Sequence, residues 1–271
     1  MENKYIVKFT TDQVKTLKQL FNLLNGYIKE LNLIFTPDGI FINYHEALNI
    51  SIKVEINNEN NTFSEFYCAE PRCVGVNVST ISSVLKSISD NSDILFTFFI
   101  EKAYTANDNE KFGIIIFYKE NCKTITINIS IIDVNKDDVE DFEINYSCSI
   151  QMIAKSFSKD ITIAKANSSE ILQICYHDGE MTYITKCKNK ADIVLNCPDI
   201  KVCSFNDKKN NEFINIYIKI TKLIDIIKFS NISNVVVMYL KNNSSLILEY
   251  DISNMGKITF GIPNDLKPDD Y

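Results

Sequence analysis

Hydrophobic and polar positions alternate along most of the chain with a period of two, which predicts many short β-strands. The clearest segment is Thr124–Ile131, in which isoleucine occupies every second position, as in a half-buried strand. Helical spacing replaces this alternation in a few places. One is the stretch after Thr10, where apolar residues form a single stripe at Val14, Leu17, Leu20, Phe21, Leu24 and Ile28. This mixture of elements predicts an α+β fold.

The predicted elements repeat about 140 positions along the chain. The segment Leu33–Ile40, in which Asp-Gly interrupts an apolar run, returns as Ile174–Met181. Asp-Gly in this setting favours a hairpin, because glycine accepts a positive φ. A predicted helix followed by a strand at Val78–Lys86 returns 142 positions later at Ile220–Lys228, and the first helix has its counterpart at Lys155–Lys165. The repeat predicts two topologically similar domains, each a sheet with two helices on one face.

An acidic segment without strand or helix periodicity separates the two halves. It contains six acidic residues between Asp133 and Asn145. We therefore assign residues 1–131 to an N-terminal domain, 132–145 to a connecting loop and 146–271 to a C-terminal domain with an acidic tail. A chain of 271 residues is long enough for two such domains.

Polar residues at the predicted helix starts indicate how the helices are capped. Thr10–Gln13 resembles a capping box, with Gln13 placed to reach back to the first amide. The helices at 78–86 and 220–228 each carry a hydroxyl residue at their start, Ser79 and Thr221, that is able to cap the free amides.

Composition indicates a globular chain without a membrane segment or a metal. Hydrophobic residues make up 45% of it, no apolar run approaches the roughly 20 residues of a membrane span, and residues 1–9 lack the long apolar centre of a signal peptide. The eight cysteines are scattered without a Cys-x-x-Cys pair, and only His45 and His177 could join them in a zinc site. We expect an intracellular protein with no metal and no cofactor.

Charge restricts how such a chain could meet nucleic acid. The formal net charge is −7, from 28 basic and 35 acidic residues, and Arg72 is the only arginine. The chain as a whole therefore repels a phosphate backbone, so DNA binding requires lysines gathered on one surface. A single arginine also argues against bidentate reading of guanine edges.

Catalytic signatures are missing from the sequence. It contains no phosphate-binding loop, no Gly-x-Ser-x-Gly and no His-Glu-x-x-His. An enzyme using His45, next to Glu46, or His177, next to Asp178, is conceivable as an alternative, since a neighbouring carboxylate can orient a histidine base. Neither histidine has a nucleophile nearby in sequence, and we expect a binding protein rather than an enzyme.

Five short segments, in one order on a duplicated chain, resemble the proliferating cell nuclear antigen family, the eukaryotic-type DNA sliding clamps. They are Phe63–Cys68, Gly75–Val78, Ile132–Val134, Tyr146–Cys148 and Leu248–Gly256. The last is the most specific, because the family carries a near-identical Val-Glu-Tyr-x-Ile-x-x-Met-Gly. The resemblance extends from about Lys15 to Leu266, and the divergence and strong Asn, Ile and Lys bias favour a viral or AT-rich source.

The resemblance implies a closed ring of three identical chains whose helices line a central hole around double-stranded DNA. Such a ring is a processivity factor for DNA polymerase and a docking platform for a clamp loader and for replication and repair proteins, in the nucleus or at a cytoplasmic viral replication site. An alternative keeps the fold in a monomeric or dimeric processivity factor held on DNA by charge. By matched position, the residues facing DNA are Lys18, Arg72, Lys86, Lys155, Lys159, Lys165, Lys222 and Lys228.

The resemblance also implies two protein-binding surfaces. Neighbouring chains meet through Ile125, Ile127 and Ile129 on one strand and through Ile193 and Leu195 on another. Partner proteins insert a short helix with apolar and aromatic anchors into a pocket formed by His45, Asn49, Ile50, Ile52, Val139, Phe142, Ile262, Pro263 and Leu266. This pocket departs from the family pattern at His45-Glu46, at Asn49-Ile50 and at Phe260-Gly261. His177 replaces the family's ubiquitin-accepting lysine.

Overall fold

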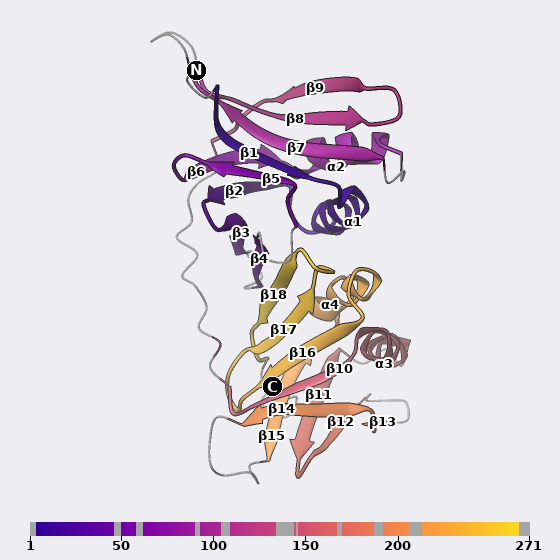
Figure 1. Ribbon diagram of the computed structural model, residues 1–271. Coiled ribbons are helices and arrows are strands. Elements are labelled where there is room, and N and C mark those ends of the chain that lie inside the picture. The colour runs from indigo at the N-terminus through magenta and orange to yellow at the C-terminus, as the bar shows by residue number, and fades with distance from the viewer. Residues whose placement is uncertain are drawn as a thin grey trace. The chain divides into compact units, whose positions relative to one another are not determined.

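The computed structural model divides into two compact units, and each is described separately (Figure 1). Unit 1 comprises residues 1–44, 53–138 and 252–257, and unit 2 comprises residues 45–52, 139–251 and 258–271. The structure describes residues 4–45, 50–57, 62–89, 93–103, 109–133, 144, 146–166, 170–186, 192–205 and 213–265.

The two halves of the chain form the same succession of elements. The N-terminal half forms β1 (Tyr5–Thr11), α1 (Val14–Leu24), β2 (Glu30–Thr36), β3 (Gly39–His45), β4 (Ser51–Asn57), β5 (Glu65–Cys68), β6 (Arg72–Asn77), α2 (Val78–Ser87), β7 (Ile94–Glu101), β8 (Lys111–Tyr118) and β9 (Lys123–Ile129). The C-terminal half forms β10 (Cys148–Ile153), α3 (Ala154–Ala166), β11 (Ile171–His177), β12 (Glu180–Thr185), β13 (Ile193–Cys197), β14 (Ile200–Phe205), β15 (Ile214–Lys219), α4 (Ile220–Leu223), the 3₁₀ helix η2 (Ile226–Asn231), β16 (Val235–Leu240), β17 (Leu246–Asp251) and β18 (Gly256–Ile262).

Strand order repeats between the units as closely as the element order. In unit 1 the strands run β5-β1-β7-β8-β9 and β4-β3-β2-β6, and in unit 2 they run β14-β10-β16-β17-β18 and β13-β12-β11-β15. Adding nine to each strand number of unit 1 gives the order in unit 2. The duplicated α+β organisation that the sequence predicts is therefore present in the topology.

The apolar stripe of the first helix packs into the core of unit 1 as the sequence predicts. Val14, Leu17, Leu20, Phe21 and Leu24 are all buried, and α1 packs against α2 and against β7. Ile28 is also buried, but it follows the helix, because the chain turns after Leu24.

The predicted caps of the helices are wrong. Gln13 is the N-cap of α1, but its side chain makes no capping bond; its backbone amide instead donates to Thr11 Oγ1 at 3.1 Å. At α2 the cap is Asn77 rather than a hydroxyl residue, with Oδ1 accepting from the amides of Ser79 and Thr80 at 3.0 and 3.4 Å. Asparagine supplies the same acceptor from a residue with extended backbone, as an N-cap requires.

The predicted helix at 220–228 is wrong in its length. It divides into α4 and η2, and Lys219 begins α4 without a side-chain cap. Five β-branched residues lie between 220 and 227, and their restricted χ1 angles disfavour a continuous α-helix.

Both predicted hairpins are present. β2 pairs with β3 and β11 pairs with β12, each antiparallel. Asp178 and Gly179 have φ values of 49° and 85°, as the two central residues of a type I′ turn require. In the first hairpin Gly39 follows the turn, and a Cβ there would lie 2.1 Å from the carbonyl oxygen of Ile56, so only glycine fits.

Candidate nucleic-acid interface and docking surfaces

The helices α1 and α2 of unit 1 present a surface that contains lysine but no acidic residue. Lys15 on α1 and Lys86 in the last turn of α2 are both exposed. The other exposed positions of α2 are hydroxyl residues, Ser79, Thr80, Ser83 and Ser87. A cation in the last turn also interacts favourably with the helix dipole. This surface can therefore accept a phosphate without repulsion.

Lys18 is engaged within unit 1. Its Nζ donates to the carbonyl oxygen of Ile88 at 3.0 Å, and its side chain is half-buried. Ile88 is the C-cap of α2, so Lys18 ties α1 to the end of α2 while adding positive charge near the same surface.

Helix α3 of unit 2 is lysine-rich on its exposed side. Its buried residues Ala154, Phe157, Ile161 and Ala164 define the core side, and Lys155, Lys159 and Lys165 are exposed. Lys155 and Lys159 are spaced i, i+4, so their like charges destabilise the helix by about 0.2–0.5 kcal/mol. Helix stability therefore does not explain why two lysines have this spacing. An anionic ligand bound over the exposed side of α3 would explain it.

Helix α3 contains one acidic residue, Asp160, which follows Lys159 in the sequence. Asp160 is half-buried, and burial raises the pKa of its carboxyl, with Lys159 acting in the opposite direction. Altogether α1, α2 and α3 contain six lysines and one aspartate, whereas the full chain has 28 basic and 35 acidic residues. Positive charge is thus concentrated on the helices of a chain that is acidic overall.

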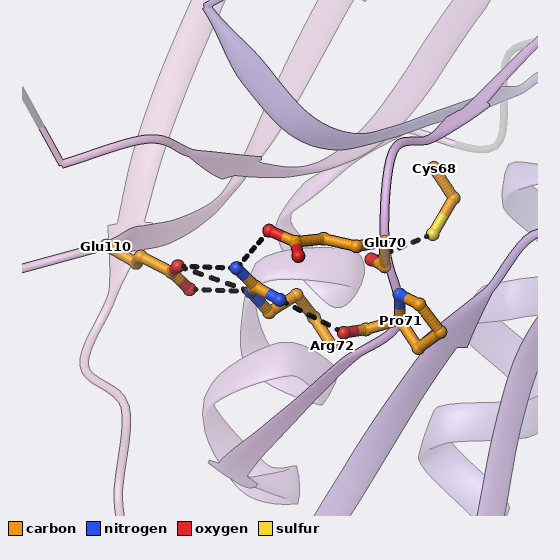
Figure 2. A network of polar contacts seen from close by, with 5 residues as sticks. All are labelled: Cys68, Glu70, Pro71, Arg72 and Glu110. Carbon is orange, nitrogen blue, oxygen red and sulfur yellow. Dashed lines mark hydrogen bonds and ion pairs between the residues drawn. The ribbon is translucent and has the colours of Figure 1, made fainter.

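Arg72, which the resemblance placed among the DNA-facing residues, is held by carboxylates (Figure 2). Its Nε donates to both carboxylate oxygens of Glu110 at 3.2 Å, and its Nη2 pairs with Glu110 at 3.1 Å and with Glu70. Nη1 donates to the carbonyl oxygen of Pro71. The carboxylate of Glu110 raises the pKa of Arg72. Two acids surround one guanidinium, so the site is locally negative and we leave Arg72 out of the DNA-facing set.

Lys222 is also neutralised within the chain. Its Nζ lies 2.9 and 3.0 Å from the two carboxylate oxygens of Asp265, and both side chains are only 14% exposed. The segment that carries Asp265 lies along β15: Asp265 Oδ2 accepts from the amide of Lys219, and Asn264 Oδ1 accepts from the amide of Tyr217. Lys222 on α4 therefore holds Asp265, whose segment lies along β15, and we leave Lys222 out of the DNA-facing set as well.

Asp265→Asn should loosen this attachment while keeping an acceptor for the Lys219 amide. The half-buried Lys222 would lose its counter-ion, and a hydrogen bond to a charged group contributes about 1.5–3 kcal/mol. We expect amide hydrogen exchange in β15 to accelerate by about 10- to 100-fold, measured by mass spectrometry. The control is Lys228→Gln, which breaks the exposed pair with Asp225 and should leave β15 unchanged. Unaltered exchange in Asp265→Asn would rule out the attachment.

The two strands predicted to join neighbouring chains are both edge strands. β9 ends the sheet order of unit 1 and β13 ends that of unit 2, and within the described residues each has one paired neighbour, β8 and β12 respectively. Ile125, Ile127, Ile193 and Leu195 are half-buried, and Ile129 is buried. Long alternating edge strands favour pairing with another chain.

Of the five described residues of the predicted partner pocket, three belong to the core of unit 2. Ile50, Ile52 and Ile262 are 0–3% exposed, Pro263 is half-buried, and His45 is exposed, with its Nδ1 3.0 Å from Ser51 Oγ. Asn49, Val139, Phe142 and Leu266 lie outside the described residues. The pocket therefore stays a prediction, and of its described members only His45 and Pro263 present much surface.

Within the described part of the chain, neither histidine belongs to a cluster of metal-ligating side chains. The ring of His177 lies 5.5 Å from that of Phe213, and no three His, Cys, Asp or Glu side chains within the described ranges gather as metal ligands. No helix in the same part of the chain is long and apolar enough to cross a membrane.

Sequence reasoning missed the residues that hold the chain's own cations. Glu110 is 38 positions from Arg72, and Asp265 is 43 positions from Lys222. No periodicity or motif connects such pairs. The sequence shows that the C-terminal tail is acidic, but it does not show that Asp265 pairs with Lys222.

Comparison with known proteins agrees with the resemblance. Residues 7–141 match the family described as proliferating cell nuclear antigen, N-terminal domain. A probable DNA polymerase sliding clamp 1 of Paramecium bursaria Chlorella virus 1 is 24% identical over 267 residues, covering 96% of this chain and 97% of the viral protein. The proliferating cell nuclear antigen of Chaetomium thermophilum is 22% identical over 92% of this chain and 94% of its own length.

A solved structure has the same fold. The crystal structure of the proliferating cell nuclear antigen of Entamoeba histolytica superposes with a TM-score of 0.79 at 17% identity, covering 97% of this chain and all of that one. The repeated topology, the ordered sequence matches and the family assignment of its N-terminal half agree: the chain belongs to the proliferating cell nuclear antigen family.

Proposed function

We propose that the protein is a DNA sliding clamp, a processivity factor for DNA polymerase. In this proposal three copies close into a ring, the helices α1, α2 and α3 face the hole, and double-stranded DNA passes through it. The observation that carries the proposal is the concentration of lysine on these helices in a chain with a net charge of −7. The relatives named as sliding clamps support it.

The proposed DNA-facing set consists of Lys18, Lys86, Lys155, Lys159 and Lys165, to which the exposed Lys15 is added; Lys228 on η2 is left out, because it pairs with Asp225. None of Lys86, Lys155, Lys159 and Lys165 forms an ion pair within the described residues, so their charge is available to phosphates. Lysine contacts to phosphate carry no sequence information and weaken with salt. Such contacts suit a ring that is held on DNA by enclosure and must move along it.

The same proposal includes docking of replication and repair proteins. It retains the pocket predicted around His45 and Pro263 and the division into domains at 1–131 and 146–271 joined by residues 132–145. A clamp loader and a polymerase are the expected partners, and the expected site of action is the nucleus or a cytoplasmic viral replication site.

The oligomeric state tests the ring. Three copies of the 31.1 kDa chain form a species of about 93 kDa with cyclic symmetry. Sedimentation of the purified full chain should give this mass over a wide range of protein concentration. A 31.1 kDa species at every concentration would contradict the ring and favour a monomeric factor held by charge.

A further inference from the structure

The side chain of Arg72 connects the two sheets of unit 1. Arg72 begins β6, in the sheet β4-β3-β2-β6, whereas Glu110 directly precedes β8, in the sheet β5-β1-β7-β8-β9. Arg72 Nε donates to both carboxylate oxygens of Glu110 at 3.2 Å, and Nη2 donates to Oε1 at 3.1 Å (Figure 2). A guanidinium paired with both oxygens fixes direction as well as distance. The pair therefore sets how β6 lies against the start of β8.

The chain leaves the edge strand β9 beside this pair. Ile129, the last residue of β9, is paired with Phe112 near the start of β8. Three residues further on, the amide of Ile132 donates to the carbonyl oxygen of Gly75 at 3.0 Å and forms an antiparallel bridge with it. Gly75 lies on β6, three positions after Arg72. One strand, β6, therefore contacts both the start of β8 and the segment that follows β9.

The attachment of this segment to β6 depends on a single main-chain contact among the described residues. The bridge between Ile132 and Gly75 is isolated, and Ile131 and Asp133 on either side of Ile132 are both exposed. A hydrogen bond weakens steeply when its atoms move out of line, and an isolated bridge has no neighbouring pairs to keep it aligned. The bond from Ile132 therefore requires that β6 stay in place relative to β8 and β9.

The second carboxylate at Arg72 does not connect the sheets. Glu70 is two positions before Arg72 in the same segment, and its side chain is 57% exposed, compared with 37% for Glu110. An exposed pair between near neighbours in the sequence contributes little to the placement of distant strands. The two glutamates thus surround one guanidinium, but only Glu110 belongs to the other sheet.

We propose that Arg72 is a positioning residue for partner docking, because its pairing with Glu110 fixes the point at which the chain leaves β9 and begins the connecting loop 132–145. This inference rests on the proposed function, in which Val139 and Phe142 of that loop belong to the docking pocket. A loop whose start is held in place loses less conformational freedom when a partner binds, so the affinity for the partner is higher.

Hydrogen exchange in the full chain tests the positioning role. Glu110→Gln removes the connection between the sheets, and amide exchange across residues 129–133 should accelerate by about three- to tenfold. Glu70→Gln is the matched control, because it removes the same charge from the same guanidinium, and it should leave this exchange unchanged. Arg72→Lys keeps the charge but loses the paired donors, so it should resemble Glu110→Gln. The exchanged pair Arg72→Glu/Glu110→Arg should restore most of the protection.

Binding of a fluorescent synthetic peptide, a short helix with apolar and aromatic anchors, tests the connection to docking. Glu110→Gln should bind it about two- to fivefold more weakly than the wild type and Glu70→Gln equally well, with the mass of the assembly unchanged in both. Equal exchange in Glu110→Gln and the wild type, or equal acceleration in both glutamate variants, would overturn the positioning role. Faster exchange without weaker peptide binding would overturn its connection to docking. A peptide that does not bind the wild-type chain would instead contradict the predicted pocket.

Discussion

Ile127→Asp should convert the assembly of about 93 kDa into separate chains of 31.1 kDa. In the proposed ring Ile127 lies in the middle of the edge strand β9, at the contact with the next copy, where a carboxylate would lose water without gaining a partner. An unpaired polar group in an apolar environment costs about 1–3 kcal/mol in mutational data, and an ionised group costs more. Each of the three contacts should therefore weaken by about 100-fold or more.

Sedimentation velocity and circular dichroism together check this prediction. In the free chain Ile127 is half-buried on an edge strand, so the substitution should leave the secondary structure of the separated chain intact. The matched control is Ile153→Asp, because Ile153 is 52% exposed and outside the proposed contact. That variant should keep the full mass. A folded Ile127→Asp chain that still sediments as a trimer would contradict the assignment of β9 to the contact.

Replacing Lys155, Lys159 and Lys165 together by glutamine should strongly weaken the binding of linear duplex DNA through phosphate contacts. All three lysines are exposed on α3, and removing a lysine that neutralises one phosphate makes the slope of log K against log salt shallower by about 0.9. In a trimer the triple substitution removes nine positive charges. We expect affinity at about 50 mM salt to fall at least tenfold, with a shallower salt dependence that reflects the remaining lysines of α1 and α2.

Fluorescence anisotropy with a labelled duplex over a range of salt concentrations measures both quantities. Arg72→Gln and Lys222→Gln are the controls, because both cations are neutralised by carboxylates, and both variants should bind like the wild type. Asp160→Asn removes the only acid of α3 and should strengthen binding. Since the pKa of Asp160 lies above its ordinary value of 3.8, its ionised form destabilises the fold above that pKa, so the neutral asparagine should not reduce stability at neutral pH. Equal losses in the α3 and control variants would contradict the proposed surface.

The sequence predicts this fold well where the information is local. Alternation every second residue predicts β9, and the stripe from Val14 to Leu24 predicts the buried side of α1. The Asp-Gly repeat predicts both hairpins, since the turn geometry depends on a few neighbouring residues. The duplication then follows from comparing these local patterns.

The sequence predicts less where a contact joins distant segments. Helical spacing places Lys155, Lys159 and Lys222 on polar positions alike, but only the structure reveals that Asp265 meets Lys222. Arg72 is a similar case, because its partner Glu110 lies 38 positions later in the sequence, after α2 and β7. Matched position in a family thus identifies which lysines lie on the helices, whereas the pairing of each charge depends on side chains brought together by folding.

The central claim is that the protein stays on DNA by enclosing it, and retention on a duplex with blocked ends tests this most directly. A linear duplex is fixed to a bead at one end, the protein is allowed to thread on, and the free end is then closed with a bulky protein. An enclosing ring should survive a wash at about 1 M salt, where the Debye length is about 3 Å and surface attraction is screened, and should leave when a nuclease cuts the duplex. Loss of the protein in the salt wash even when the free end is blocked would contradict enclosure and identify a factor held by charge alone.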